Sequence, residues 1–140
     1  MELLGYTPWG CIDLISASTG EMKKGEAHAY CLRQIKEAVA DIAPDDVAKI
    51  IIAYEPIWAI GSGKSATAAD AEEMLAAIRG YLRERYGSET VEKIRILYGG
   101  SVKPENIAQF MNEEDIDGAL IGGASLKAES YGKMIRWRER

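Results

Sequence analysis

A repeated alternation of short apolar strands, glycine-containing loops and amphipathic helices constrains the fold of this chain most strongly. The runs Ile50 to Tyr54, Ile94 to Tyr98 and Gly118 to Ile121 are short, apolar and each followed by a loop that contains glycine. Continuous apolar runs of this length are typical of parallel strands that are covered on both faces. Strands that alternate with helices predict an α/β fold with a parallel sheet.

Helical periodicity fills the segments between these strands. Thr67 and Asp70 form a capping-box pattern at the start of one helix, and Pro104 suits the first turn of another. The residues predicted to face the core of the helix after Thr67 are Ala71, Met74, Leu75, Ile78, Tyr81 and Leu82. The spacing predicts helices over residues 25–42, 67–82, 104–111 and 128–140.

The number of units sets the size of the sheet. With residues 6–16 as a further strand, the chain has four βα units in 140 residues, whereas a complete (β/α)₈ barrel takes about 250 residues. The predicted fold is therefore a single domain, residues 1–140, with the architecture of a (β/α)₄ half of a TIM barrel. A half barrel has two unpaired strand edges and an open apolar interior, so we expect a homodimer in which a second copy completes eight strands.

Composition excludes several classes of function. The net charge is −5 and basic residues are scattered, which argues against nucleic-acid binding. Cys11 and Cys31 are too few for a disulfide framework or a thiolate metal site, so we expect no metal, no cofactor and a reducing, cytoplasmic location. No apolar run approaches the roughly 20 residues of a membrane span, and the first residues lack the basic region of a signal peptide. We expect no membrane association.

A carboxylate followed by a lid-like loop is the strongest chemical motif. Glu55 directly follows the strand Ile50 to Tyr54, at the end of the sheet where functional residues of parallel α/β proteins converge. A stiff segment, a tip of small residues and a helix cap come next, which predicts a base beneath a lid that excludes water. The predicted lid and hinge residues are Pro56, Ile57, Trp58, Ala59, Ile60, Gly61, Ser62, Gly63, Lys64, Ser65 and Ala66.

Two further strand ends carry loops suited to an anion. Residues 98–101 and 122–126 are rich in glycine, which lets backbone N–H groups approach a ligand closely. A helix that follows each loop adds a favourable dipole, so the two loops together predict a phosphate cradle.

These motifs resemble the second half of triosephosphate isomerase. Residues 53–66 resemble the lid signature of that family, and residues 98–102 and 121–126 resemble its two phosphate-loop signatures, in the same order. The resemblance covers residues 25–127 and implies that Glu55 moves the proton that interconverts glyceraldehyde 3-phosphate and dihydroxyacetone phosphate. It also implies that a phosphorylated ligand, phosphate or sulfate binds at Gly61, Ser101, Gly122 and Gly123. Ser62 stands where the family often has Thr.

The resemblance also implies a limit on activity. The family needs a Lys after its first strand and a His after its fourth, and these 140 residues have no counterpart of either. The single histidine, His28, lies on a predicted helix. We therefore expect weak or absent isomerase activity, and the alternative is an inactive, self-associating half-barrel scaffold that at most binds phosphate.

Residues 4–24 resemble a different barrel. They are similar to the last strand and loop of family 1 glycosidases of the 6-phospho-β-glucosidase type, which implies sugar contact by Trp9 and 6-phosphate contact by Ser18 and Lys24. Gly25 and Glu26 replace the residues that usually follow there. The paired carboxylates that retaining glycosidases need are absent, so glycosidase activity is not expected. The hypothesis is a chimera of residues 1–24 and 25–140.

Each motif also has a simpler structural interpretation. A lone strand-end carboxylate such as Glu55 is usually solvated, and paired glycines alone can form tight turns. Trp58 suits packing, and Trp137 suits an exposed tail. The order and spacing of the three loops favour the functional interpretation over these alternatives.

Overall fold

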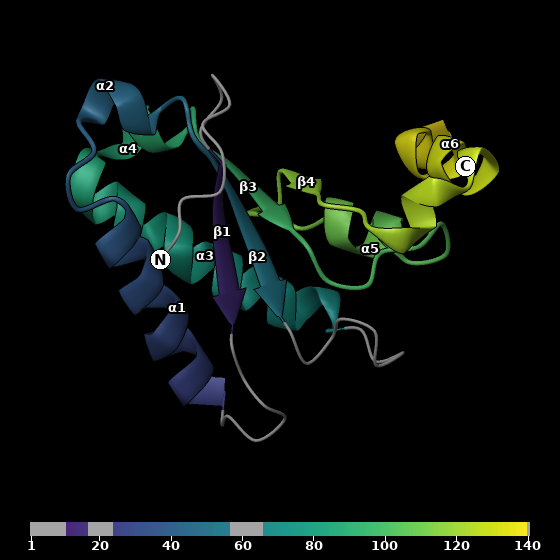
Figure 1. Ribbon diagram of the computed structural model, residues 1–140, viewed down its shortest axis with the longest axis horizontal. Coiled ribbons are helices and arrows are strands. Elements are labelled where there is room, and N and C mark those ends of the chain that lie inside the picture. Colours follow the sequence, from purple (N-terminus) through teal and green to yellow (C-terminus); the bar gives the residue numbers. More distant parts are fainter. Residues whose placement is uncertain (1–10, 17–23, 57–65, 140) are drawn as a thin grey trace.

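The computed structural model describes residues 11–16, 24–56 and 66–139, with backbone alone for residues 11–16, 24 and 25 (Figure 1). The elements, in chain order, are β1 (Cys11–Ser16), α1 (Lys24–Ala38), α2 (Pro44–Val47), β2 (Ile51–Pro56), α3 (Ala68–Tyr86), α4 (Ser88–Val91), β3 (Arg95–Tyr98), α5 (Ile107–Met111), β4 (Gly118–Ala119), the 3₁₀ helix η2 (Gly123–Leu126), α6 (Ala128–Ile135) and the 3₁₀ helix η3 (Trp137–Glu139).

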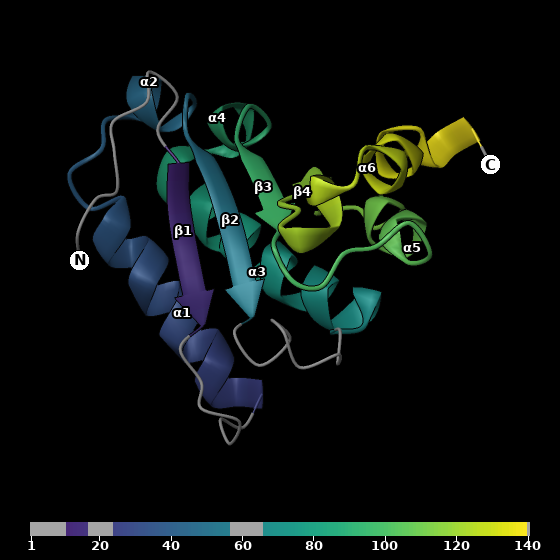
Figure 2. The ribbon, with the colours of Figure 1, turned by 45° about the vertical axis from the view of Figure 1, so that its right-hand side comes forward.

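The strands form one parallel sheet in the order β1-β2-β3-β4. Tyr54 on β2 is in register with Tyr98 on β3, and Tyr98 is in register with Ala119 on β4. Because all the pairs are parallel, the carboxyl ends of the strands lie at the same end of the sheet. Figure 2 shows α3 behind the sheet. The predicted α/β class is confirmed and is consistent with part of a TIM barrel. Closure into a barrel stays a prediction.

The core of the molecule lies on one face of the sheet. Ile52 and Tyr54 of β2, with Ile96 and Tyr98 of β3, join one buried cluster with side chains of α1 and α3. Leu97 lies on the opposite face, is half-buried and does not belong to this cluster. Ala53, in register with Leu97, is also outside this cluster but fully buried, so the described residues cover the opposite face in part.

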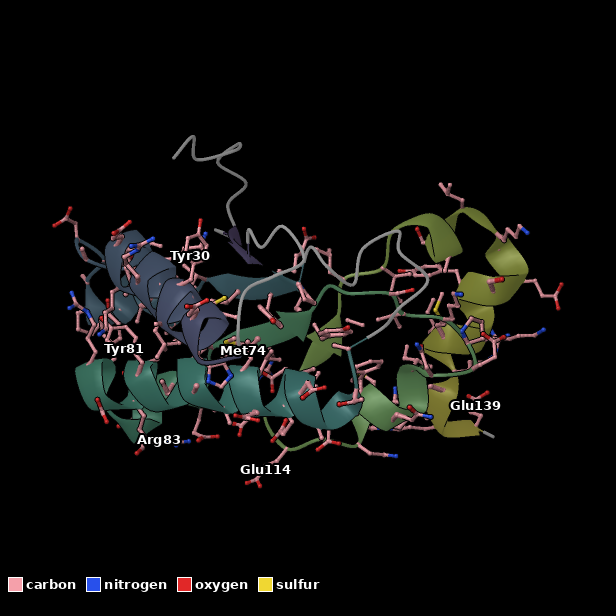
Figure 3. The ribbon with its side chains drawn as sticks, turned by 90° about the horizontal axis from the view of Figure 1, so that it is seen from below. Tyr30, Met74, Tyr81, Arg83, Glu114 and Glu139 are labelled. Atoms are coloured by element: carbon pink, nitrogen blue, oxygen red, sulfur yellow. The ribbon has the colours of Figure 1, made fainter. Side chains whose placement is uncertain are left out.

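Helix α3 packs along the sheet as its sequence predicts. Thr67 Oγ1 accepts a hydrogen bond from Asp70 N at 3.1 Å and donates one to Asp70 Oδ2 at 2.6 Å, which confirms the cap. Figure 3 shows Met74 on the side of α3 that faces the sheet, and Tyr81 between α3 and α1. The helix ends before Gly87, whose φ of 84° strongly favours glycine.

A charged network joins α3 to the amino ends of β3 and β4. Arg79, 6% exposed, places Nε 2.6 Å from Asp115 Oδ1 and Nη2 2.7 Å from Asp117 Oδ2. Asp117 Oδ2 also accepts the Ile96 N–H at 2.8 Å, and both carboxylate oxygens of Glu72 lie within 3.2 Å of Asp115 N. Sequence periodicity places Arg79 beside the buried stripe of α3 but does not predict its burial.

Several predicted boundaries were wrong. The strand predicted to end at Ile121 stops at Ala119, although Leu120 N still donates to Tyr98 O at 2.9 Å. The helix predicted over residues 25–42 ends at Ala38, and α5 begins three residues after Pro104. The last predicted helix, residues 128–140, breaks at Arg136, where ψ reaches 33°. Helices α2 and α4 have four residues each, too few for a periodic signal.

Two further observations bear on the predictions. Of the strand predicted over residues 6–16, the structure describes β1, residues 11–16. Within the described residues, the molecule has no helix that is both long enough and apolar enough to span a membrane.

Candidate functional site

Glu55 lies at the carboxyl end of β2 and packs against the loop that follows β3. Gly99 N donates a hydrogen bond to Tyr54 O at 2.8 Å, which extends the pairing of the two strands beyond Tyr98. A Cβ atom on Gly99 would lie 2.7 Å from Glu55 Cγ and 3.4 Å from Glu55 Oε1. Glycine is therefore required at position 99 for the half-buried Glu55 side chain to keep this position. Glu55 of β2 thus contacts the beginning of the loop that follows β3.

Tyr98 supports this loop from inside the core. Its fully buried ring stacks on Phe110, with centroids 4.3 Å apart and planes inclined by 15°. A Cβ atom on Gly100 would overlap the Tyr98 hydroxyl, so the backbone passes directly over the ring edge. Burial raises the pKa of Tyr98 to about 12, and the backbone of Ala66 opposes that rise. Tyr98 thus stays protonated at neutral pH and lies near Ala66, the last predicted hinge residue.

The loop after Tyr98 is held by a side chain that the sequence analysis did not single out. Asn106 Nδ2 donates to Ser101 O at 3.0 Å, and Asn106 Oδ1 accepts from Lys103 N at 2.7 Å. Ser101 is half-buried and Val102 is buried. An Asn shortly after a Gly-Ser turn is the sequence signal that could have identified this closure, because Asn side chains commonly bond to nearby backbone groups.

The third predicted loop follows β4. Gly122 and Gly123 are exposed, and Ser125 donates to Gly122 O both from its N–H at 2.9 Å and from its Oγ at 2.6 Å. Since β3 and β4 are parallel neighbours, Ser101 and Gly122 both follow strands at the same edge of the sheet. The predicted helices do not begin directly after the two loops as α-helices. Gly122 is followed by a single 3₁₀ turn, and the short helix α5 begins only at Ile107.

The remaining predicted site residues are located only in part. Pro56 and Ala66 are described and buried, and Lys24 is the first residue of α1, with backbone alone described. The others lie outside the described residues: Trp9, Ser18, Ile57, Trp58, Ala59, Ile60, Gly61, Ser62, Gly63, Lys64 and Ser65. Of the residues predicted to bind phosphate, the structure describes Ser101, Gly122 and Gly123 and not Gly61.

Three further observations concern residues away from Glu55 in the described part of the chain. His28 lies on α1, 23% exposed, with Nε2 3.9 Å from Glu73 Oε1. Trp137, predicted to be exposed, packs against the core in a half-buried position. Residues 11–16, 24–56 and 66–139 contain no cluster of three or more His, Cys, Asp or Glu side chains suited to a metal ion.

These features define a class of protein. A parallel α/β sheet carries a carboxylate and two glycine loops at the carboxyl ends of adjacent strands, which is the end of the sheet where proteins of the (β/α) barrel class have their active sites. The family profile for triosephosphate isomerase matches residues 3–138. The chain belongs to the triosephosphate isomerase family.

Individual relatives agree with the profile. The triosephosphate isomerase of Caldanaerobacter subterraneus subsp. tengcongensis is 48% identical over 123 residues, which are 88% of this chain and 50% of that protein. The triosephosphate isomerase of Chloroflexus aurantiacus is 48% identical over 134 residues, 96% of this chain and 52% of that protein. The enzyme of that name from a Roseiflexus species is 52% identical over 113 residues, 81% and 44% of the two chains. The chain thus spans about half the length of the curated relatives it matches.

The matched range bears on the amino-terminal segment. It begins at residue 3, so it includes residues 4–24, which were predicted to derive from a glycosidase barrel. The assignment of residues 1–24 and 25–140 to two origins remains a prediction.

Proposed function

We propose that this chain carries the proton-transferring and phosphate-binding half of a triosephosphate isomerase, acting on glyceraldehyde 3-phosphate and dihydroxyacetone phosphate. Glu55 is the base that takes a proton from the carbon next to the carbonyl. Ser101, Gly122, Gly123 and Gly61 hold the phosphate through backbone N–H groups, and residues 56–66 form the lid that excludes water. The relatives' name supports this substrate pair.

The contact between Glu55 and Gly99 carries the proposal. A general base must lie within hydrogen-bond reach of its proton in a bound substrate. Glu55 Cγ lies so close to Gly99 that position 99 has no room for a side chain, and Gly99 is two residues before Ser101. A substrate whose phosphate binds beyond Ser101 would therefore extend toward the Glu55 carboxylate.

The 140 residues alone are expected to be a poor catalyst. Electrostatic groups that stabilise a developing oxyanion commonly contribute about 10²–10³ each to kcat. The family's Lys and His have no counterpart in this sequence, so we expect turnover several orders of magnitude below that of the family, or none.

A coupled isomerase assay tests the proposal with the 140-residue chain and two Glu→Gln variants. Glu55→Gln should remove the activity that the chain has, because an amide cannot accept the proton as a carboxylate does. Glu92→Gln should leave it unchanged, since Glu92 follows α4 at the opposite end of β3 and pairs only distantly with Arg83, at 3.8 Å. Equal and measurable rates for the chain and Glu55→Gln would reject Glu55 as the base.

A second function is supported by the apolar surface beside β4. Leu120 is 38% exposed, Leu126 86% and Ile135 63%. Among the described strands, β4 pairs only with β3 and β1 pairs only with β2, so both edges of the sheet are open. The edge strands β1 and β4 run in the same direction. A two-fold axis parallel to the strands would therefore pair β4 of each copy with β1 of the other.

The second candidate is thus a homodimeric half-barrel scaffold whose second copy covers this surface. Sedimentation at micromolar concentration should give a dimer, and Leu120→Asp should shift it toward monomer while Glu92→Gln does not. A well-folded wild-type monomer at that concentration would exclude this scaffold.

A further inference from the structure

Asn106 occupies a helix cap but does not cap its helix. It is the residue before α5, where Asn is favoured because its side-chain oxygen accepts an N–H from the first helical turn. No such bond forms here. Its oxygen instead accepts the Lys103 N–H at 2.7 Å, and its nitrogen donates to the Ser101 carbonyl at 3.0 Å. The side chain therefore serves the loop before α5.

Both hydrogen bonds act on the segment that carries Ser101. They fix the Ser101 carbonyl and the Lys103 N–H, and the side chain of Val102 between them is buried. On the other side, the loop is held by Gly100 packed over the Tyr98 ring. Neither Asn106 bond uses the Ser101 N–H. The bond at Ser101 O instead restricts the backbone next to this N–H group.

We propose that Asn106 is a positioning residue for phosphate binding at Ser101; this inference rests on the proposed function. A backbone donor that is already oriented binds an anion without the cost of ordering the loop. Helix α5 cannot supply this order, because it has five residues and begins six residues after Ser101. The Asn106 side chain takes that role.

Affinity for a phosphorylated ligand measures the effect. Calorimetry with dihydroxyacetone phosphate and, separately, inorganic phosphate would compare the 140-residue chain with Asn106→Ala, Asn106→Asp and Asn112→Ala. Asn106→Ala should raise Kd about tenfold, which corresponds to about 1.4 kcal/mol. Asn106→Asp should weaken binding further, since it loses the donor to Ser101 and adds a negative charge. Asn112, exposed at the other end of α5, is the matched control and should leave Kd unchanged.

Backbone dynamics provide a second readout. The ¹⁵N order parameters of Ser101 and Val102 should fall in Asn106→Ala and stay unchanged in Asn112→Ala, while the Gly122 resonance still responds to phosphate. Unchanged order parameters in Asn106→Ala would overturn the inference, and so would an unchanged Kd in a chain that binds the ligand. A wild-type chain that binds neither ligand would instead overturn the proposed function, and the inference with it.

Discussion

The two ends of the sheet are stabilised in different ways. At the amino ends of β3 and β4, Arg79 makes charged contacts of 2.6 and 2.7 Å with two aspartates. At the carboxyl ends, Glu55 and the ring of Tyr98 pack closely against the backbone of Gly99 and Gly100, and the loops are closed by short-range hydrogen bonds. The amino end thus fixes elements distant in sequence, whereas the carboxyl end keeps backbone donors close to the surface.

This difference agrees with the different roles of the two faces of (β/α) barrels. Residues at the carboxyl face of such sheets usually carry the chemistry, and residues at the opposite face usually carry stability. A change in ligand binding caused by substitutions at the amino end would contradict this difference. So would carboxyl loops that prove to be the main source of stability.

The largest expected effect is at Arg79. Arg79→Met leaves Asp115 and Asp117 close together without their cation, which should lower the free energy of unfolding by about 3 kcal/mol. Urea denaturation with an unchanged m-value measures this loss. Arg83→Met on the same helix is the control, because Arg83 is 47% exposed and its contact with Glu92 is 3.8 Å. It should change stability by less than about 0.5 kcal/mol. Equal losses of unfolding free energy in the two variants would show that the Arg79 network does not stabilise the protein more than an exposed ion pair does.

A smaller loss is expected at Gly100. Gly100→Ala forces a methyl group into the buried Tyr98 hydroxyl and should cost about 1–3 kcal/mol through overpacking. Gly80→Ala, within α3, is a control of opposite sign. A Cβ atom there meets nothing within 4 Å, so helix propensity should raise stability by about 0.5–1 kcal/mol. An unchanged free energy of unfolding in Gly100→Ala would show that the loop can move away from Tyr98, contrary to the close packing described for the carboxyl end.

Local sequence patterns were sufficient to predict which residues lie at the carboxyl ends of the strands. Glu55, Ser101 and Gly122 follow strands whose apolar runs are visible in the sequence, and parallel pairing then places them at one edge. The Thr67 cap and the buried stripe of α3 were also predictable from spacing.

Long-range contacts were not predictable in this way. Arg79 reaches Asp117 across 38 residues, and the periodicity of α3 does not predict that Arg79 is buried while Arg83 is exposed. The shortness of β4 is also not encoded in its apolar run, because strand length depends on a neighbour at the sheet edge. Asn106 looks like an ordinary cap until its hydrogen bonds are seen.

The smallest expected effect is a pH dependence at Glu72. Burial raises the pKa of this carboxyl above 4.5, the Asp115 N–H opposes the rise, and the charges of Asp115 and Glu113 add to it. The folded state therefore binds the proton more tightly than the unfolded state. The resulting stabilisation is complete below pH 4.5 and is lost as pH rises through the folded pKa.

The free energy of unfolding of Glu72→Gln, relative to wild type, should consequently increase from pH 4 to pH 7. The increase should be roughly 0.5 kcal/mol or less because solvent screens the group. Thermal unfolding at both pH values measures the difference. Glu129→Gln is a control of opposite sign, since the hydrogen bond from Lys133 lowers the pKa of Glu129, and wild-type stability there is lost as pH falls. A Glu72 variant that follows Glu129→Gln in sign would mean that the Asp115 N–H outweighs burial, and the amino-end network would then be stabilised by ionised Glu72 as well as by Arg79.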